Sequence, residues 1–349
     1  MRALVIGASG FVGRALTERL LADGRTPRVL VRSEAQAETL RAMGAEPFVG
    51  ELADPNAIAR AAMGVERIFH CAGESSPRAA PAALNWIHVA GAENLVAAAR
   101  QAGVPRTVFV SCADVTLCNR DRLNWSERSA LAQNPFDSWV RSKLLGEELA
   151  LQSSDQNHEF TAVRPPFVWG PGDKNRLPQI CAEGLRGGLR LYGSGQNLLA
   201  TVYIDNLIDA LLCAAEHPQV GGLAFHVADS EFHTAAEFFG ALCQALGLGP
   251  PRRGLYPVAY AAAWLRAALG RSGPWPIDVV RRGRGSLLDC AAAASKLDFT
   301  PRVAQQQGME ALSAWVREVG GAAAIASLGR KPADEADVAH FEALAQADG

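Results

Sequence analysis

The stretch Met1-Arg-Ala-Leu-Val-Ile-Gly-Ala-Ser-Gly-Phe-Val-Gly13 decides the fold of this chain. An apolar run of strand type breaks into Gly7, Gly10 and Gly13, and a helical pattern runs from Phe11 to Leu21. In a strand–turn–helix unit, such glycines permit a tight turn, let the backbone approach a pyrophosphate and let the helix pack closely on the strand. The helix N-terminus then offers free N–H groups to the phosphates. The stretch therefore predicts a bound dinucleotide.

Short apolar runs alternate with amphipathic helical patterns through residues 1–170. Repeated units of this kind predict an α/β fold, with a Rossmann-type, doubly wound parallel sheet covered by helices on both faces. We expect this dinucleotide-binding domain at 1–170, with elements returning around 201–228, a smaller α/β substrate domain at 171–319, and a polar, mobile tail at 320–349. The expected strands of the sheet are Arg2–Ile6, Arg28–Val31, Glu46–Val49, Arg67–Cys71, Thr107–Val110 and Thr161–Arg164.

Composition excludes several classes of protein. The 349 residues carry a net charge of −2 and no basic block, which argues against nucleic-acid binding. The seven cysteines show no CxxC spacing, and with the scattered histidines they predict free thiols in a reducing cytoplasm and no metal site. No apolar run reaches the roughly 18 residues needed to span a bilayer, so we expect a cytoplasmic protein.

The residue after the second expected strand favours one dinucleotide over the other. Arg32 stands 19 positions beyond Gly13, where an acidic residue would hold the ribose 2′-hydroxyl of NAD. An arginine there suits the 2′-phosphate of NADP, so NADP(H) is expected rather than NAD(H). A solvated arginine at a strand end is the open alternative. After the fourth strand, small residues at 71–73 let the dinucleotide lie against the backbone.

Several motifs in this order resemble the extended short-chain dehydrogenase/reductases, the NAD-dependent epimerase/dehydratase family. The similarity is greatest to the 3β-hydroxysteroid dehydrogenase and sterol-4-carboxylate 3-dehydrogenase branch. The matching motifs are GASGFVG (7–13), GELAD (50–54), FHCAG (69–73), VSCADV (110–115), WVRSK (139–143), VRPPFVWGPGD (163–173), TVYIDNLIDALL (201–212) and KLDFTPRVAQQQGMEALSAWV (296–316). The resemblance implies a dinucleotide site formed by Gly7, Ser9, Gly10, Phe11, Val12, Gly13, Arg32, Glu51, Leu52, Cys71, Ala72, Gly73, Lys143, Pro165 and Val168.

The catalytic set of that family is altered here. In the family, a serine positions the substrate oxygen, a tyrosine carries its proton, and the lysine of a YxxxK motif lowers the pKa of the phenol. Lys143 is retained, but Trp139 stands at the tyrosine position, and an indole N–H cannot deliver a proton reversibly. Cys112 stands at the serine position with Ser111 just before it, and His88 replaces a usual asparagine.

Three functions remain open from these residues. The chain is a redox enzyme with a substitute acid or base, a repurposed non-redox enzyme (isomerase, cyclase, dehydratase or decarboxylase), or an NADP(H)-binding sensor without turnover. The retained glycine loop and lysine favour the redox enzyme. Its candidates for the substitute group are Tyr203, His88, Asp114, Cys112 and Lys143.

The expected substrate is a small apolar molecule of sterol, terpenoid or polyketide type. An apolar cleft is expected from Trp86, Trp139, Trp169, Tyr203 and a helix at Leu255–Leu269. That helix suits packing on its own domain better than a peripheral membrane contact. The basic run 281–284 suits a solvated loop better than a phosphate or lipid site. Because relatives dimerise, a homodimer is left open.

Overall fold

The computed structural model describes residues 1–132, 137–271 and 273–329. Its main sheet is parallel, with the order β12-β7-β5-β4-β1-β2-β3. The chain leaves the central β1 toward β2 and β3, then crosses back to β4, so the direction of winding reverses beside β1. Ligands of such sheets bind at this switch point. The strands are β1 (Ala3–Ile6), β2 (Arg28–Val31), β3 (Glu46–Val49), β4 (Arg67–His70), β5 (Arg106–Val110), β7 (Glu159–Arg164) and β12 (Ala224–His226).

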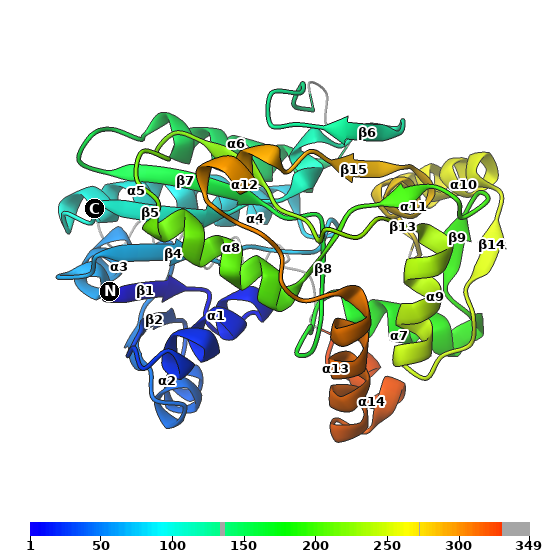
Figure 1. Cartoon of the computed structure of the whole chain (residues 1–349), viewed down its shortest axis with the longest axis horizontal. Helices are drawn as coiled ribbons and strands as arrows, with labels where there is room; N and C mark the ends of the chain where they lie inside the picture. Colours follow the sequence, from blue (N-terminus) through cyan, green and yellow to red (C-terminus); the bar gives the residue numbers. More distant parts are fainter. Residues whose placement is uncertain (133–136, 272, 330–349) are drawn as a thin grey trace.

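Helices cover both faces of the sheet (Figure 1). On one face α1 (Phe11–Ala22) packs against α8 (Ile204–Glu216). On the other face α5 (Gly91–Gln101) packs between α3 (Pro55–Ala62) and α6 (Ser138–Gln152). The predicted sheet and its covering helices are confirmed, with the edges of the expected strands differing by no more than two residues.

At two glycines of the first turn, neighbouring backbone lies so close that no side chain fits. Gly7 has a φ of +86°, and a Cβ there would lie 2.6 Å from the backbone nitrogen of Ala72. A Cβ on Gly13 would overlap the carbonyl of Gly7. The first strand, its turn and the loop after β4 can therefore meet only because these side chains are absent.

The helical segment that precedes β5 is divided into three parts. It consists of α4 (Pro81–Asn85), a π-helical turn (Trp86–Ala90) and α5. A π-helical turn inserts an extra residue into a helix and is common at functional sites. Here the turn buries the side chain of His88, which is 2% exposed. The 3.6-residue pattern in the sequence does not reveal this insertion.

The smaller domain is built from helices and short strand pairs. A capping box begins α9, because Glu237 N–H donates to Thr234 Oγ1 at 3.2 Å and Glu237 accepts from Thr234 N–H at 2.8 Å. The helices are α7 (Arg176–Gly187), α9 (Ala235–Ala245), α10 (Tyr256–Ala268), α11 (Pro276–Gly283) and α12 (Ala291–Lys296). The strands pair as β13-β10-β15-β6, β11-β8 and β14-β9. They are β6 (Arg122–Trp125), β8 (Phe167–Trp169), β9 (Arg190–Tyr192), β10 (Leu198–Leu199), β11 (Thr201–Tyr203), β13 (His233–Thr234), β14 (Arg252–Gly254) and β15 (Ser286–Leu288).

The segment expected as a tail begins with further helix. After α13 (Gln305–Glu318) comes α14 (Gly321–Ser327), which packs against α7 and buries Ile325 completely. Residues 330–349 lie outside the described part of the chain. None of the helices described between residues 1 and 329 is long and apolar enough to cross a membrane.

The short helix α2 (Glu34–Ala42) completes the main domain, where it packs beside β2 and β3.

Candidate active site

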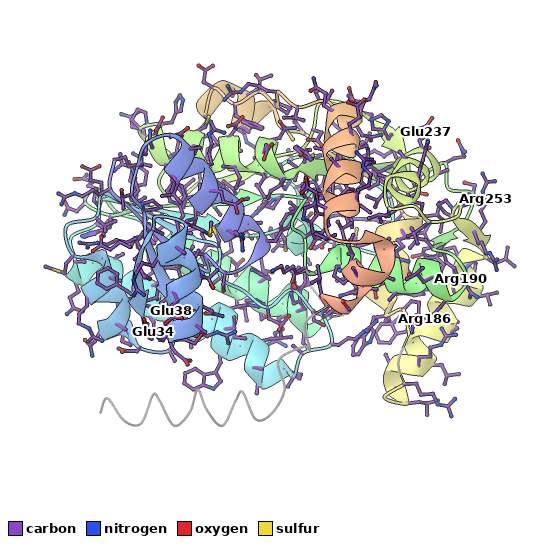
Figure 2. The ribbon with its side chains drawn as sticks, turned by 90° about the horizontal axis from the view of Figure 1, so that it is seen from below. Glu34, Glu38, Arg186, Arg190, Glu237 and Arg253 are labelled. Carbon is purple, nitrogen blue, oxygen red and sulfur yellow. The ribbon has the colours of Figure 1, made fainter. Side chains whose placement is uncertain are left out.

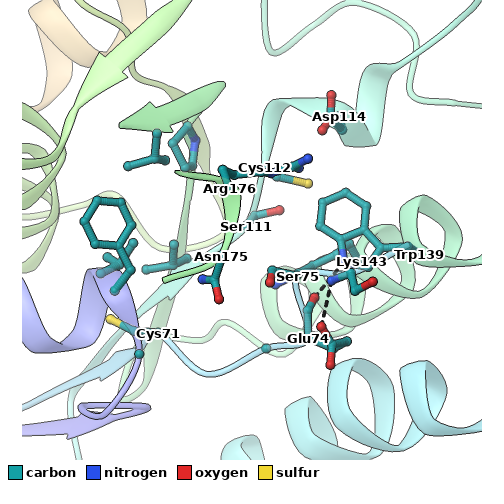
Figure 3. Close-up of a pocket in the computed structure, with 18 of the residues that line it drawn as sticks. Cys71, Glu74, Ser75, Ser111, Cys112, Asp114, Trp139, Lys143, Asn175 and Arg176 are labelled. Carbon is teal, nitrogen blue, oxygen red and sulfur yellow. Dashed lines mark hydrogen bonds between the residues drawn. The ribbon is translucent and has the colours of Figure 1, made fainter. Parts of the chain in front are cut away.

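A cavity of about 610 Å³ opens at the carboxyl ends of β1, β2, β4 and β5 and extends to α7 and α11 (Figure 3). Every predicted dinucleotide residue except Gly13 lines it. Gly13 instead lies under the turn, where it permits the packing described above. The cavity therefore has a cofactor half, formed by the glycine turn and the loops after β2, β3 and β4, and a substrate half toward α7 and α11.

The residues of the cofactor half fit a dinucleotide. The N-terminus of α1 faces the cavity, and its N-cap Gly10 has no side chain to cover the first N–H groups. Arg32 is exposed at the end of β2, and its neighbour Ser33 caps α2 by accepting the N–H of Gln36 at 3.4 Å. This places a guanidinium and a helix N-terminus together at the rim, which is the environment a ribose 2′-phosphate prefers.

Lys143 lies where the two halves meet. Its side chain comes from α6 and is only 7% exposed. A Cβ built on Gly73 would lie 2.8 Å from Lys143 Nζ, so the ammonium lies directly against the loop after β4. Burial lowers the pKa of Lys143 below its usual value, with partial compensation from Cys112 and Glu147. A lysine with a lowered pKa can release a proton more readily than one in water.

Ser111 places a hydroxyl without a hydrogen-bond partner among the described residues in the cavity. It follows β5, is 4% exposed, and its Oγ has no hydrogen-bond partner among the described residues. A buried hydroxyl without a partner is costly, and in a cavity it is a candidate for binding a ligand. Cys112, at the expected serine position, also lines the cavity. Burial raises the pKa of its thiol to about 12, helped by Asp114, so the group stays protonated at neutral pH.

The indole N–H of Trp139 already has a hydrogen-bond acceptor within the protein. Its Nε1–H donates to the carbonyl of Glu74 at 2.6 Å, and its ring is 5% exposed. The guanidinium of Arg281 lies 5.0 Å from the ring centroid. Trp139 therefore forms a wall of the substrate half and shapes the loop after β4, but its N–H is not available to a substrate.

Comparison with known proteins agrees with this geometry. The profile of the NAD dependent epimerase/dehydratase family matches residues 3–228. The 4-hydroxy-2-methyl-3-oxo-4-farnesyl-3,4-dihydroquinoline-1-oxide ketoreductase of Stigmatella aurantiaca is 32% identical, over 89% of this chain and 96% of its own length. The decarboxylating sterol-4-alpha-carboxylate 3-dehydrogenase of Mus musculus is 26% identical, over 88% of this chain and 89% of its own length. The dTDP-glucose 4,6-dehydratase of Streptomyces venezuelae, solved with NAD bound, has the same fold (TM-score 0.72, 24% identity, 91% and 97% coverage).

The chain belongs to the NAD-dependent epimerase/dehydratase family. The resemblance inferred from the motifs is confirmed, including the similarity to sterol dehydrogenases. Within this family the chain is an NAD(P)-dependent oxidoreductase.

His88 is hydrogen-bonded at both ring nitrogens. Its Nε2 accepts the N–H of Glu74 at 3.0 Å, so Nδ1 carries the ring proton and lies 2.8 Å from Ser142 Oγ. Burial and Lys143 hold the pKa of His88 well below its usual value. Together with Trp139, it holds the backbone of Glu74 at both the N–H and the carbonyl. The two unusual residues thus hold the peptide groups on either side of Glu74, and His88 does not line the cavity.

Tyr203 and its neighbours lie outside the cavity of this oxidoreductase. The Tyr203 ring packs 5.0 Å from the ring of Trp169, and burial raises the pKa of its phenol to about 12. Trp169 is fully buried, and neither residue lines the cavity. The helix α10 also contributes no lining residue. Of the expected apolar wall only Trp86 and Trp139 line the cavity, because the other aromatic side chains fill the core between β8, β11 and α9.

Asp114 is also unsuited to carry the substrate proton. Arg281 donates to its Oδ2 at 2.9 and 2.6 Å. Burial pushes the pKa of Asp114 upward, but the charges of Arg281 and Arg122 outweigh burial and lower it. The expectation of a solvated loop at 281–284 is wrong for its first three residues, which belong to α11. Arg281 pairs with Asp114, and Arg282 pairs with Glu183 at 2.7 Å.

Sequence reasoning missed Arg176, which lines the substrate half. It is the first residue of α7, and its guanidinium has no hydrogen bond or ion pair within 4 Å among the residues the structure describes. Burial and the charge of Arg281 lower its pKa to about 10. Figure 3 shows Arg176, Ser111 and Lys143 in one cavity. A cation at a helix N-terminus is unfavourable. An arginine just after Asp173, a residue type that caps helices, could therefore have indicated a functional role from the sequence.

Proposed function

We propose that this protein is an NADP(H)-dependent oxidoreductase that transfers hydride between the nicotinamide and the carbinol or carbonyl carbon of an apolar substrate. One observation carries the assignment of the site: the buried hydroxyl of Ser111 has no partner among the described residues and lies in the same cavity as Lys143. In this proposal Ser111, and not the neighbouring Cys112, holds the substrate oxygen. The ketoreductase and dehydrogenase names of the relatives support the reaction class.

The proton is assigned to Lys143 by comparing the candidates. Cys112 holds its proton at neutral pH, Asp114 is ionised and paired, and Tyr203 and His88 lie outside the cavity. When bound, the reduced dinucleotide supplies the hydride. In the direction of reduction, Ser111 Oγ–H donates to the carbonyl oxygen, and the Lys143 ammonium gives the proton that completes the alcohol. Lys143 then regains a proton from solvent.

Arg176 supports a substrate that is apolar but carries an anionic group. A half-buried guanidinium without a carboxylate partner is stabilised when a ligand supplies one. The sterol-4-alpha-carboxylate named for the mouse relative has such a carboxylate beside the reacting position. We therefore place the carboxylate of a 3-oxo or 3-hydroxy acid on Arg176, with its apolar skeleton against Trp86 and Trp139.

The preference for NADP(H) rests on Arg32 at the rim of the cavity. Its exposed guanidinium lies after β2, and the adjoining N-terminus of α2 adds a positive dipole end. Both features favour the phosphate of NADP over the bare hydroxyl of NAD.

The test is nicotinamide absorbance with NADPH and apolar ketones, each offered with and without a neighbouring carboxylate. Ser111→Ala is expected to lower kcat/KM about 100-fold, the loss typical of one donor to a developing oxyanion. Cys112→Ala, the matched control, should change it by no more than about threefold, since a neutral thiol is a weak donor. Substrate conversion without an absorbance change would indicate a non-redox enzyme. Tight NADPH binding with no turnover would indicate a sensor.

A further inference from the structure

The outer face of α10 is an apolar surface without a covering element. Ala263 is the only buried residue of this 13-residue helix. Five of the eleven large hydrophobic side chains exposed in the described part of the chain lie between residues 255 and 269. They are Leu255 (74% exposed), Val258 (64%), Trp264 (42%), Leu265 (62%) and Leu269 (56%). On a helix of 3.6 residues per turn these positions lie within one half of the circumference. We call this set the α10 face.

The chain segment that carries the α10 face has charges of a single sign. Between Glu237 and Asp278 the sequence contains no acidic residue and four arginines, Arg252, Arg253, Arg266 and Arg271. All four are exposed, and none forms an ion pair among the described residues. Figure 2 shows Arg253, Arg186 and Arg190 at one end of the molecule, together with the acidic Glu237 and opposite Glu34 and Glu38 on α2.

The inner face of α10 connects this surface to the active site. Tyr256 and Tyr260 stack with their centroids 5.8 Å apart and pack toward α11. Tyr260 also belongs to the apolar cluster around Trp139. Beyond the C-terminal end of α10, Arg78, which lines the cavity, donates to the carbonyl of Gly273 at 2.7 Å. The helix therefore joins the wall of the substrate half to an exposed apolar surface.

We infer that the α10 face binds the surface of an anionic lipid bilayer, with the aliphatic side chains in the interface and the arginines on lipid phosphates. A helix with an apolar face and basic flanks binds membranes in this way. Each basic residue near an anionic leaflet adds to the attraction. A second copy of this chain is a poor occupant, since the surface has no acidic residue between 238 and 277 to meet the arginines of its partner.

The inference places the protein where an apolar substrate is dissolved, but it is independent of turnover. A bilayer on the α10 face would lie next to the apolar cluster that joins Tyr260 to Trp139. Membrane binding can therefore be measured even if the proposed reaction is wrong.

The experiment is flotation of the full chain with vesicles of phosphatidylcholine, alone or with roughly one third phosphatidylglycerol. The protein is expected to float with the anionic vesicles, and less at raised salt because screening weakens the contribution of the arginines. Leu265→Glu combined with Leu269→Glu should lower the partition coefficient at least about tenfold. Arg252→Gln combined with Arg253→Gln should lower it on anionic vesicles and reduce its salt dependence.

The matched control is Leu185→Glu, a similarly exposed leucine (55%) on α7. It should float like the wild type, and all variants should keep wild-type NADPH affinity, which shows that they are folded. The inference is overturned if the wild type does not float, if it floats equally with both vesicle types, or if the control loses as much as the α10 variant. It is also overturned if the wild type is a dimer that Leu265→Glu dissociates.

Discussion

The two halves of the cavity differ in how closely they keep the pattern of the family. In the cofactor half the glycine turn, the small residues at 71–73 and Lys143 are present and meet as expected. In the substrate half, Trp139 stands for the proton-carrying tyrosine, Cys112 for the serine, and Arg176 and Arg281 add charge to an apolar cleft. The difference teaches that dinucleotide binding and substrate chemistry are separable within this fold.

The unusual residues of the substrate half form a connected set. His88 and Trp139 bind the N–H and the carbonyl of Glu74. Ser142 links the two by accepting the Nδ1–H of His88 and donating to the carbonyl of Trp139 at 3.0 Å. A network of this kind is sensitive to each member. Trp139 thus helps to hold the loop after β4, and its bonded N–H leaves the Ser111 hydroxyl as an unpartnered donor in the cavity.

The largest effect is expected in the cofactor half. Gly7→Ala should lower NADPH affinity by at least about 100-fold, since the new Cβ would lie 2.6 Å from the nitrogen of Ala72. Gly24→Ala is the matched control, because its φ of +72° is equally left-handed but nothing lies within 4 Å of a Cβ. It should cost about 1 kcal/mol of unfolding free energy and leave affinity unchanged. Equal losses in both variants, measured by fluorescence titration, would contradict the close approach at Gly7.

The next effect belongs to the substrate half. Arg176→Gln should raise KM for a 3-oxo acid about 30-fold, the loss expected for a charge-assisted pair, with kcat changed little. The same variant should not affect the corresponding ketone that lacks a carboxylate. Arg186→Gln, on the exposed part of the same helix, is the control. A loss that is equal for both substrates would show that Arg176 does not recognise the anion.

A smaller effect is expected at the rim. Arg32→Gln should weaken NADPH binding about tenfold while NADH binding stays the same, since only NADPH presents the 2′-phosphate. Isothermal titration with both dinucleotides measures this difference. Unchanged affinity for NADPH would contradict this role and would show that Arg32 is a solvated arginine at a strand end, which is the alternative that the sequence leaves open.

The sequence predicted the sheet and the cofactor half because these depend on local patterns. Strand periodicity, the glycine spacing of 7–13 and the order of motifs are all readable along the chain. The substrate half depends on contacts between distant segments. The partner of Trp139 is 65 residues away at Glu74, and that of Arg281 is 167 residues away at Asp114. The π-helical turn at His88 and the core position of Tyr203 likewise have no local signal.

The central claim is that Trp139 shapes the substrate half while Ser111 and Lys143 act on the substrate. The most direct test is the rate of NADPH oxidation with one accepted ketone for the wild type, Trp139→Phe and Trp139→Tyr. Trp139→Phe should lower the rate about five- to tenfold, since one hydrogen bond that holds Glu74 is lost while Ser111 and Lys143 remain. Trp139→Tyr should be at least about tenfold faster, because a phenol can carry the proton. A Trp139→Phe variant as inactive as Ser111→Ala would place the indole in the chemistry and contradict the claim.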